Sequence, residues 1–265
     1  MVKIDWNSIW DTQMLLTDRA RLNDGRFWDK ISNEERASPF TEELLEFQLE
    51  CLALKGDETI LEIGPGKGRL TKELGRRAAH VTALDPSQGM IDSLTLTLSE
   101  EGIDNVEIIK GSLEDIEKIS IGEHDVVVAS YSLFMMDMSK CLKMMTKLSR
   151  DRVVVFVPAN IRMPVAIQNI LHGTDAVIQV PDHVMLFNIL WYMGYPTDVL
   201  VKSYTAKREY EDLEAAVDEH MRFHNVPDYK REDMTQYVRS LVKYDGVRPI
   251  IEQERSTAML RWRSV

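Results

Sequence analysis

The stretch that decides the fold is Ile60-Leu-Glu-Ile-Gly-Pro-Gly-Lys-Gly68, an apolar run that ends in three glycines at alternate positions. A second apolar run, Val81-Thr-Ala-Leu-Asp85, ends in an acid 21 residues after Gly64. A strand, a glycine turn and an acid at the end of the next strand form a nucleotide site at the carboxyl edge of an α/β sheet. The sequence therefore predicts such a site, with Asp85 placed to accept hydrogen bonds from a ribose diol.

The spacing of the glycines also indicates which nucleotide binds. A dinucleotide fingerprint needs Gly or Ala at position 69, where this chain has Arg69, and a P-loop needs Ser or Thr after its lysine, where Lys67 is followed by Gly68. Glu62 precedes the first glycine by two residues, and a carboxylate there suits a ligand with a positive amine better than a pyrophosphate. A nicotinamide-dependent oxidoreductase is therefore disfavoured.

Together these residues resemble motif I of the class I S-adenosylmethionine-dependent methyltransferases. The resemblance implies that Glu62 interacts with the methionine end of the cofactor and that Asp85 holds the ribose. It continues through three further apolar runs that resemble the third, fourth and fifth strands of that fold, and it covers residues 26 to 158 and resumes after 198. These runs are Val106-Glu-Ile-Ile-Lys110, His124-Asp-Val-Val-Val-Ala-Ser130 and Arg152-Val-Val-Val-Phe-Val157.

Further cofactor contacts are implied by the same resemblance. The segment around Trp28 is similar to the N-terminal part that folds over the cofactor, and the turn after the third strand is similar to the adenine-binding turn. That turn has Ser112 where family members often have an acid, which predicts modest cofactor affinity because a neutral acceptor forms a weaker hydrogen bond. The predicted cofactor residues are Trp28, Glu62, Gly64, Pro65, Gly66, Asp85, Pro86, Ser87, Met90, Ser112, Leu113 and Ser130.

The expected fold is α/β: a Rossmann-like, doubly wound, seven-stranded, mostly parallel sheet. We expect a helical N-terminal lid at residues 1–50 and one methyltransferase domain at 51–265, with sixth and seventh strands at 199–206 and 257–262. Residues 159–200 form a long apolar insertion, which is either a pair of core helices or a cap over the acceptor. Its methionines, Met163, Met185 and Met193, would give an adaptable lining for an apolar or planar acceptor.

Composition bears on partners and compartment. The net charge of −11 disfavours nucleic acid, because nucleic-acid enzymes need a basic surface, and the fourth strand lacks the Asn/Asp-Pro-Pro-Tyr signature of amino-methylating relatives. No apolar run approaches the ~20 residues that span a bilayer, and no signal peptide is visible at the N-terminus. The two distant cysteines indicate neither a disulfide framework nor a zinc cluster. We expect a cytoplasmic protein with a small-molecule substrate, no nucleic acid or membrane partner, no metal, and a possible homodimer.

Candidates for a general base remain weak. The best placed are Tyr131, His172 and His183, and no pair among them is decisive. Asp175, His220 and His224 are further candidates, and the last two stand four residues apart like a metal pair but lack an evident third ligand. Asp125 is interpreted as a structural contact. Lys67 and Arg69 are interpreted as solvated loop and helix-start residues.

The predicted function is methyl transfer from S-adenosylmethionine to a small-molecule acceptor with an apolar or planar part, yielding S-adenosylhomocysteine. The alternative is a noncatalytic S-adenosylmethionine-binding module that engages a protein partner. Methyl donation to any acceptor would separate the two.

Overall fold

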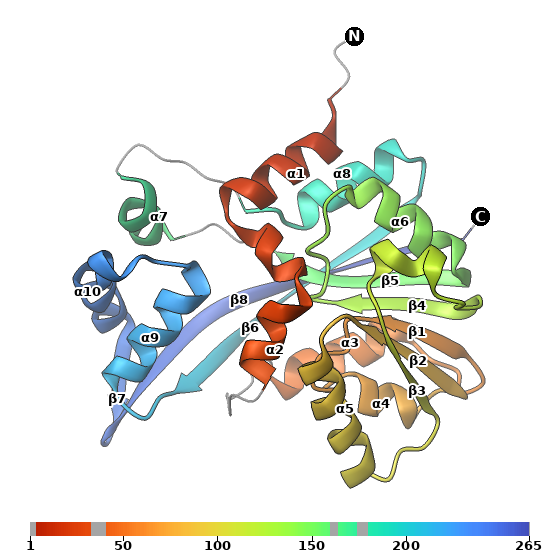
Figure 1. Ribbon diagram of the computed structural model, residues 1–265, viewed down its shortest axis with the longest axis horizontal. Helices are drawn as coiled ribbons and strands as arrows, with labels where there is room; N and C mark the ends of the chain where they lie inside the picture. The colour runs from red at the N-terminus through yellow and green to blue at the C-terminus, as the bar shows by residue number, and fades with distance from the viewer. Residues whose placement is uncertain (1–3, 33–40, 160–163, 174–179, 265) are drawn as a thin grey trace.

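The computed structural model describes residues 4–32, 41–159, 164–173 and 180–264. The chain opens with helices and then alternates strands with helices (Figure 1). The strands are β1 (Thr59–Ile63), β2 (His80–Asp85), β3 (Val106–Lys110), β4 (His124–Ser130), β5 (Ser149–Ala159), β6 (Thr197–Glu209), β7 (Val242–Asp245) and β8 (Arg248–Arg263). The α-helices are α1 (Trp6–Leu16), α2 (Gly25–Ser32), α3 (Glu42–Leu52), α4 (Thr71–Gly75), α5 (Gln88–Glu100), α6 (Met138–Lys147), α7 (Val165–His172), α8 (His183–Tyr192), α9 (Leu213–His224) and α10 (Arg231–Leu241). Short 3₁₀ turns are η1 (Arg19–Asn23), η2 (Leu113–Lys118) and η3 (Asp228–Lys230).

One sheet organises these elements, in the order β3-β2-β1-β4-β5-β8-β6. Strands β1 to β5 pair in parallel, and β8 runs antiparallel to both β5 and β6. The predicted doubly wound, mostly parallel sheet of seven strands is confirmed, and the short β7 is an eighth strand that pairs with β8. Because parallel strands bring their carboxyl ends to one edge, the predicted site residues meet there.

Helices cover both faces of the sheet, as buried parallel strands require. On one face, α1, α6 and α8 pack against β4, β5 and β8 around fully buried Leu142, Val155 and Trp262. On the other face, α3 and α4 pack against the sheet through Leu52 and Leu74, in the same buried cluster as Phe156 of β5. Figure 1 shows the two sets of helices on opposite sides of the strands.

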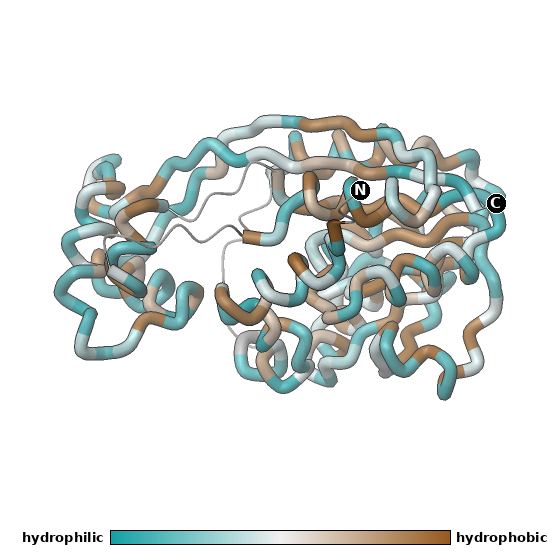
Figure 2. Tube along the Cα trace, turned by 90° about the horizontal axis from the view of Figure 1, so that it is seen from above, coloured by the Kyte–Doolittle hydropathy of each residue, from teal (hydrophilic) through white to brown (hydrophobic). Residues whose placement is uncertain are grey.

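A second, smaller core lies at the far ends of β6 and β8. There α7, α9, α10 and β7 form what we call the outer lobe, whose core includes Ile167, Val217, Met234, Val238 and Ile251. Figure 2 shows this lobe set apart from the main body, with long strands running between them. The antiparallel pairing of β6 with β8 is continuous from Thr197–Trp262 to Glu209–Ile250, so the same two strands serve both cores.

The insertion after β5 divides between these two cores. Helix α7 belongs to the outer lobe, whereas α8 packs on the main sheet through buried Met185, Leu186 and Ile189. Trp191 of the same helix is 64% exposed and stacks on Phe187. The predictions that fall on Met163 and Asp175 lie outside the described residues. The division into lid, domain and cap therefore stays a prediction.

Candidate active site

The predicted cofactor residues gather at the carboxyl edge of four adjacent parallel strands. Gly64 follows β1, Pro86 follows β2, Ser112 follows β3 and Ser130 ends β4. The order β3-β2-β1-β4 places these turns side by side. The site is therefore assembled from loops that a rigid sheet holds in register.

The glycine turn adopts a conformation that few other residues tolerate. Gly64, Gly66 and Gly68 have φ of +69°, +56° and +90°. A Cβ on Gly64 would lie 2.4 Å from the Ser132 Cβ, and one on Gly68 would lie 2.6 Å from a methyl carbon of Leu94. A Cβ on Gly66 would meet nothing within 4 Å. Two glycines are thus fixed by packing, whereas Gly66 borders open space that a ligand can enter.

Asp85 is buried at the end of β2 and is held in place by backbone donors. The Gly66 amide donates to its Oδ2 at 3.3 Å and the Ser87 amide donates to its Oδ1 at 2.9 Å. Burial raises the pKa of this carboxyl, and these two hydrogen bonds act in the opposite direction. A carboxylate has about four acceptor positions, so Asp85 retains capacity for a diol.

Glu62 is almost completely buried at the other side of the glycine turn. Burial raises its pKa to about 7, although the Thr71 hydroxyl and the Arg69 guanidinium favour the charged form. Its Oε2 is buried without a hydrogen-bond partner among the described residues. A buried acceptor of this kind fits the ammonium group of an amino-acid-bearing nucleoside, which would supply the missing donor.

A buried polar chain behind the glycine turn was missed by the sequence analysis. Arg69 donates from Nη2 to Gln48 Oε1 at 2.7 Å, and Gln48 donates from Nε2 to Ser130 Oγ at 2.8 Å. The interpretation of Arg69 as a solvated residue is therefore wrong, whereas Lys67 is exposed. Gln48 lies on α3 among apolar neighbours, and no local sequence pattern predicts its hydrogen bond to Ser130 of β4.

Helix α2 closes over the turn after β2. Asp29 accepts hydrogen bonds from Ser87 Oγ at 2.7 Å and from the Gly89 amide at 3.0 Å. Trp28 donates to the Leu22 carbonyl at 2.7 Å and lies 6.1 Å from the Phe134 ring, centroid to centroid. The hydrogen bonds of Asp29 fix α2 beside the Asp85 turn, and the sequence analysis named Trp28 but not Asp29.

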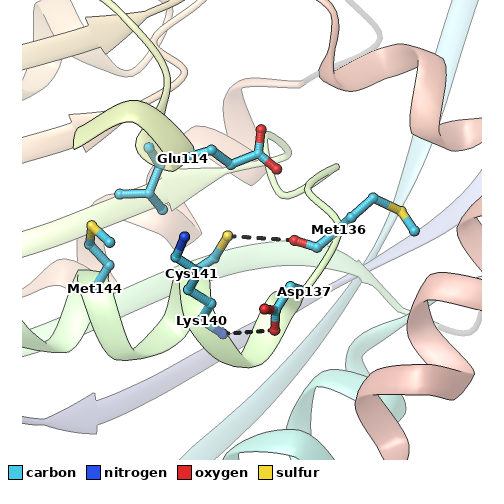
Figure 3. Close-up of a pocket in the computed structure, with 7 residues that line it drawn as sticks. Glu114, Met136, Asp137, Lys140, Cys141 and Met144 are labelled. Carbon is cyan, nitrogen blue, oxygen red and sulfur yellow. Dashed lines mark hydrogen bonds between the residues drawn. The ribbon is translucent and has the colours of Figure 1, made fainter. Parts of the chain in front are cut away.

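The turn after β3 carries both predicted adenine contacts and borders a cavity of about 210 Å³. Ser112 donates to Asp115 at 3.0 Å, and Leu113 is buried. Figure 3 shows the cavity between η2 and the first turn of α6, where Lys140 donates from its backbone to Asp137 and the Cys141 thiol faces the Met136 carbonyl. Burial raises the pKa of the Cys141 thiol to about 12, so this cysteine is no nucleophile at neutral pH.

The three base candidates occupy different environments. Tyr131 follows β4 with φ of +58°, and its hydroxyl forms a hydrogen bond with Thr257. Burial raises its pKa, so the phenol stays protonated at neutral pH and no phenolate is available to accept a proton. His183 begins α8 on the main body, and its Nδ1 is buried without a hydrogen-bond partner in the described part of the chain. His172 is exposed at the end of α7 in the outer lobe. Of the three, His183 alone offers a buried ring nitrogen free of hydrogen bonds to the described residues.

The remaining polar candidates have structural surroundings. Asp125 accepts hydrogen bonds from the Thr59 amide and hydroxyl and pairs with Arg150 at 2.9 Å, which confirms its structural interpretation. His220 and His224 have ring centroids 6.2 Å apart on α9. Among the described residues, no group of three or more His, Cys, Asp or Glu side chains could hold a metal ion.

The fold is that of the class I S-adenosylmethionine-dependent methyltransferases. Residues 60–151 match the family model described as "Methyltransferase domain". A methyltransferase of Geobacter sulfurreducens, solved with S-adenosylhomocysteine, shares the fold with a TM-score of 0.55 at 16% identity over 88% of this chain and 96% of its own. The predicted cofactor, S-adenosylmethionine, agrees with the demethylated product bound in that structure.

Curated relatives match about a third of this chain or less. Ribosomal RNA small subunit methyltransferase A of Myxococcus xanthus is 34% identical over 89 residues, 33% of this chain and 30% of the relative. A probable cobalt-precorrin-6B C(15)-methyltransferase of Methanocaldococcus jannaschii is 33% identical over 75 residues, 28% of this chain and 41% of the relative. The chain thus spans less than half of the length of these relatives.

The exclusion of nucleic acid was wrong. Several of the relatives that match this domain are named as ribosomal RNA methyltransferases. The exclusion depended largely on the net charge of the whole chain. That quantity does not give the local charge of the surface that would bind an acceptor. The described helices include none that is both long and apolar enough to cross a membrane.

Proposed function

We propose that this protein transfers the methyl group of S-adenosylmethionine to an acceptor with a planar or apolar part, most simply a small molecule. The observation that carries the proposal is the pair of buried acids on either side of the glycine turn. Glu62 has an acceptor oxygen without a partner among the described residues, and Asp85 is fixed by two backbone amides. The first suits an ammonium group and the second suits a ribose diol.

The bound cofactor would supply an electrophilic methyl group on a sulfonium. In this proposal the chain orients the reactants and excludes water, since in-line displacement depends on reactants held about 3–3.5 Å apart. Glu62 would hold the methionine end of the cofactor and Asp85 its ribose, while Ser112, Leu113 and Met90 would surround the adenine. Helix α2 shields the site, with Asp29 fixing it and Trp28 placed beside Phe134.

Methylation of an RNA base is a second candidate, because relatives that match about a third of the chain are named as ribosomal RNA methyltransferases. A nucleobase is also a planar acceptor. For the cellular compartment we propose the cytoplasm, since both free cysteines are buried and fit a reducing environment.

Calorimetry with S-adenosylmethionine, S-adenosylhomocysteine and NAD tests the cofactor assignment. We expect the first two to bind and NAD to bind far more weakly. Transfer of a radiolabelled methyl group to a metabolite panel and to ribosomal RNA then tests the acceptor class. Cofactor binding with no transfer to either set would favour the noncatalytic module, and tighter binding of NAD would overturn the proposal.

A further inference from the structure

The charged side chain of Arg19 lies in η1, the short segment that joins α1 to α2. Arg19 is only partly exposed, and no carboxylate among the described residues lies within ion-pair or hydrogen-bond distance of it. Burial and the neighbouring Arg21 lower its pKa to about 10, so the guanidinium is still a cation at neutral pH. Enclosed charges in proteins are normally paired, because leaving one unpaired costs free energy.

The adjacent carboxylate, Asp18, is engaged by a different arginine. Arg21 pairs with Asp18 at 3.0 Å and donates to the Phe223 carbonyl at 2.9 Å. His224 lies within electrostatic range of both arginines, and burial, His220 and these arginines lower its pKa to about 3. It is therefore a neutral imidazole at pH 7. Because Arg21 is already paired with Asp18, Arg19 and the neutral ring, which can donate or accept, make the surface suited to an anion.

The position of η1 links this charge to the reaction. At its C-terminal end, Asn23 donates to Glu114 at 2.7 Å, next to Leu113 of the turn after β3. At its N-terminal end, Asp18 accepts from Asn225 at 2.7 Å, at the end of α9 in the outer lobe. Arg19 therefore stands between the cofactor turns and the outer lobe, where an acceptor would enter from beyond the cofactor.

The cofactor carboxylate has a different cation near it. Arg69 is the guanidinium that interacts electrostatically with Glu62, at the methionine end of the predicted site. Arg19 interacts with Arg21 and His224 instead. The two guanidinium groups therefore lie in different surroundings, Arg69 beside Glu62 and Arg19 beside His224.

We propose that Arg19, with His224 beside it, binds an anionic group of the methyl acceptor, a carboxylate or a phosphate. This inference rests on the proposed function, because it assigns the acceptor end of the same site. It predicts that the acceptor is an anion and that Arg19 determines specificity without contacting the cofactor.

Titration of the S-adenosylhomocysteine complex with benzoate, benzamide and inorganic phosphate tests the proposal. Benzoate or phosphate should bind and neutral benzamide should not, and the preferred anion distinguishes a carboxylate from a phosphate. Arg19→Gln should weaken anion binding by about ten- to a hundredfold, as expected for losing hydrogen bonds to a charged partner. Arg19→Lys should lose less anion affinity than Arg19→Gln, because lysine keeps the positive charge. The matched control is Arg26→Gln, which removes the same charge from an exposed position on α2 paired with Asp24.

The outcomes separate the two hypotheses. If S-adenosylhomocysteine does not bind the parent protein, the proposed function fails, and the anion titration is repeated without it. Unchanged anion binding by Arg19→Gln, or equal binding of benzoate and benzamide, overturns the assignment of Arg19. A loss of S-adenosylhomocysteine affinity in Arg19→Gln that matches the loss of benzoate affinity would place the guanidinium on the cofactor carboxylate, and this too overturns it.

Discussion

At the scale of single residues, the three glycines of one turn serve different purposes. Gly64 and Gly68 are required because a Cβ would collide with Ser132 and Leu94, whereas Gly66 faces open space. All three also have positive φ, which costs an ordinary residue about 1–2 kcal/mol. Substitutions at Gly64 and Gly66 should therefore fail in different ways.

Gly64→Ala should lower the melting temperature strongly, because its Cβ would lie 2.4 Å from the Ser132 Cβ. Gly66→Ala should remain folded, with a loss of about 1–2 kcal/mol from backbone strain, but should lose most cofactor affinity because the methyl group enters the ligand space. Thermal unfolding and calorimetry on both variants provide the measurement. Equal cofactor affinity in Gly66→Ala and the parent would show that this space is not the cofactor site.

Asp85→Ala addresses the proposed ribose contact. Losing hydrogen bonds to a charged acceptor costs about 1.5–3 kcal/mol, so cofactor affinity should fall about ten- to a hundredfold. The fold should survive, since the Gly66 and Ser87 amides stand at the site edge. If this variant binds the cofactor as tightly as the parent does, Asp85 does not contact the ribose.

The raised pKa of Glu62 predicts that cofactor binding depends on pH. The ligand-free carboxyl has a pKa of about 7 against an ordinary value of 4.5, so it holds a proton below pH 7. A cofactor ammonium favours the ionised form, so binding should release a proton and affinity should rise up to about tenfold per pH unit until it levels off above pH 7. Calorimetry at pH 6 in buffers of different ionisation enthalpy measures this proton. Glu62→Gln is the control, and an equal proton release from it would refute the role of Glu62.

At the scale of elements, sequence patterns located the parallel strands well and the antiparallel ones less well. The runs behind β1, β2, β4 and β5 are mostly apolar because both faces are covered, and that signal survives in one sequence, whereas the edge strand β3 carries the exposed Glu107 and Lys110. The expected strands at 199–206 and 257–262 are shorter than β6 and β8. The extensions carry charged residues such as Lys207, Arg208 and Glu252, which hide strand pairing from an apolar pattern.

The same reasoning explains which site residues could be foreseen. Glu62 and Asp85 stand at fixed offsets from a glycine motif, so a local pattern reveals them. Arg69, Gln48 and Asp29 act through partners far away in the chain, at separations that only folding brings together. Met185 was expected to line a cavity but is 3% exposed in the main core, so a polar residue there should unfold the protein before it affects an acceptor.

The outer lobe should unfold separately from the main body. Met234 of α10 is fully buried in the outer core, and Met→Ala at such sites costs about 2–5 kcal/mol. Met234→Ala should raise deuterium uptake across residues 213–241 and leave S-adenosylhomocysteine binding nearly intact. Leu74→Ala, at a fully buried site on α4, is the matched control and should affect the main sheet instead. Loss of cofactor binding in both variants would show that the two cores unfold as one.

At the scale of the whole molecule, the two cores are joined by the long strands and, among the described residues, by hydrogen bonds between η1 and the end of α9. Asn225 ends α9 in a left-handed conformation and donates to Asp18, and Arg21 donates to the Phe223 carbonyl nearby. This contact connects the outer lobe to the segment that leads into α2. The cofactor turn, α2, η1 and α9 thus form one continuous path of contacts.

Asn225→Gly should loosen that path while it keeps the positive φ. We expect faster deuterium uptake in residues 18–24 and little change in cofactor affinity, because the bond of Asn225 to Asp18 is lost and the cofactor turns are untouched. Hydrogen exchange with and without S-adenosylhomocysteine measures both. Uptake equal to that of the parent in residues 18–24 would show that the contact does not hold η1.

The strand shared by both cores also has a consequence for synthesis. β8 contributes Ile251 to the outer core and Leu260 and Trp262 to the main core, and it leaves the ribosome after the other seven described strands. Neither core is complete before it arrives, so a nascent chain exposes the apolar flank of β5 and the inner faces of α9 and α10 together. Exposed apolar surface and unpaired strand edges promote aggregation during translation. Stalled chains that end before residue 248 should therefore depend on chaperones far more than chains released at full length.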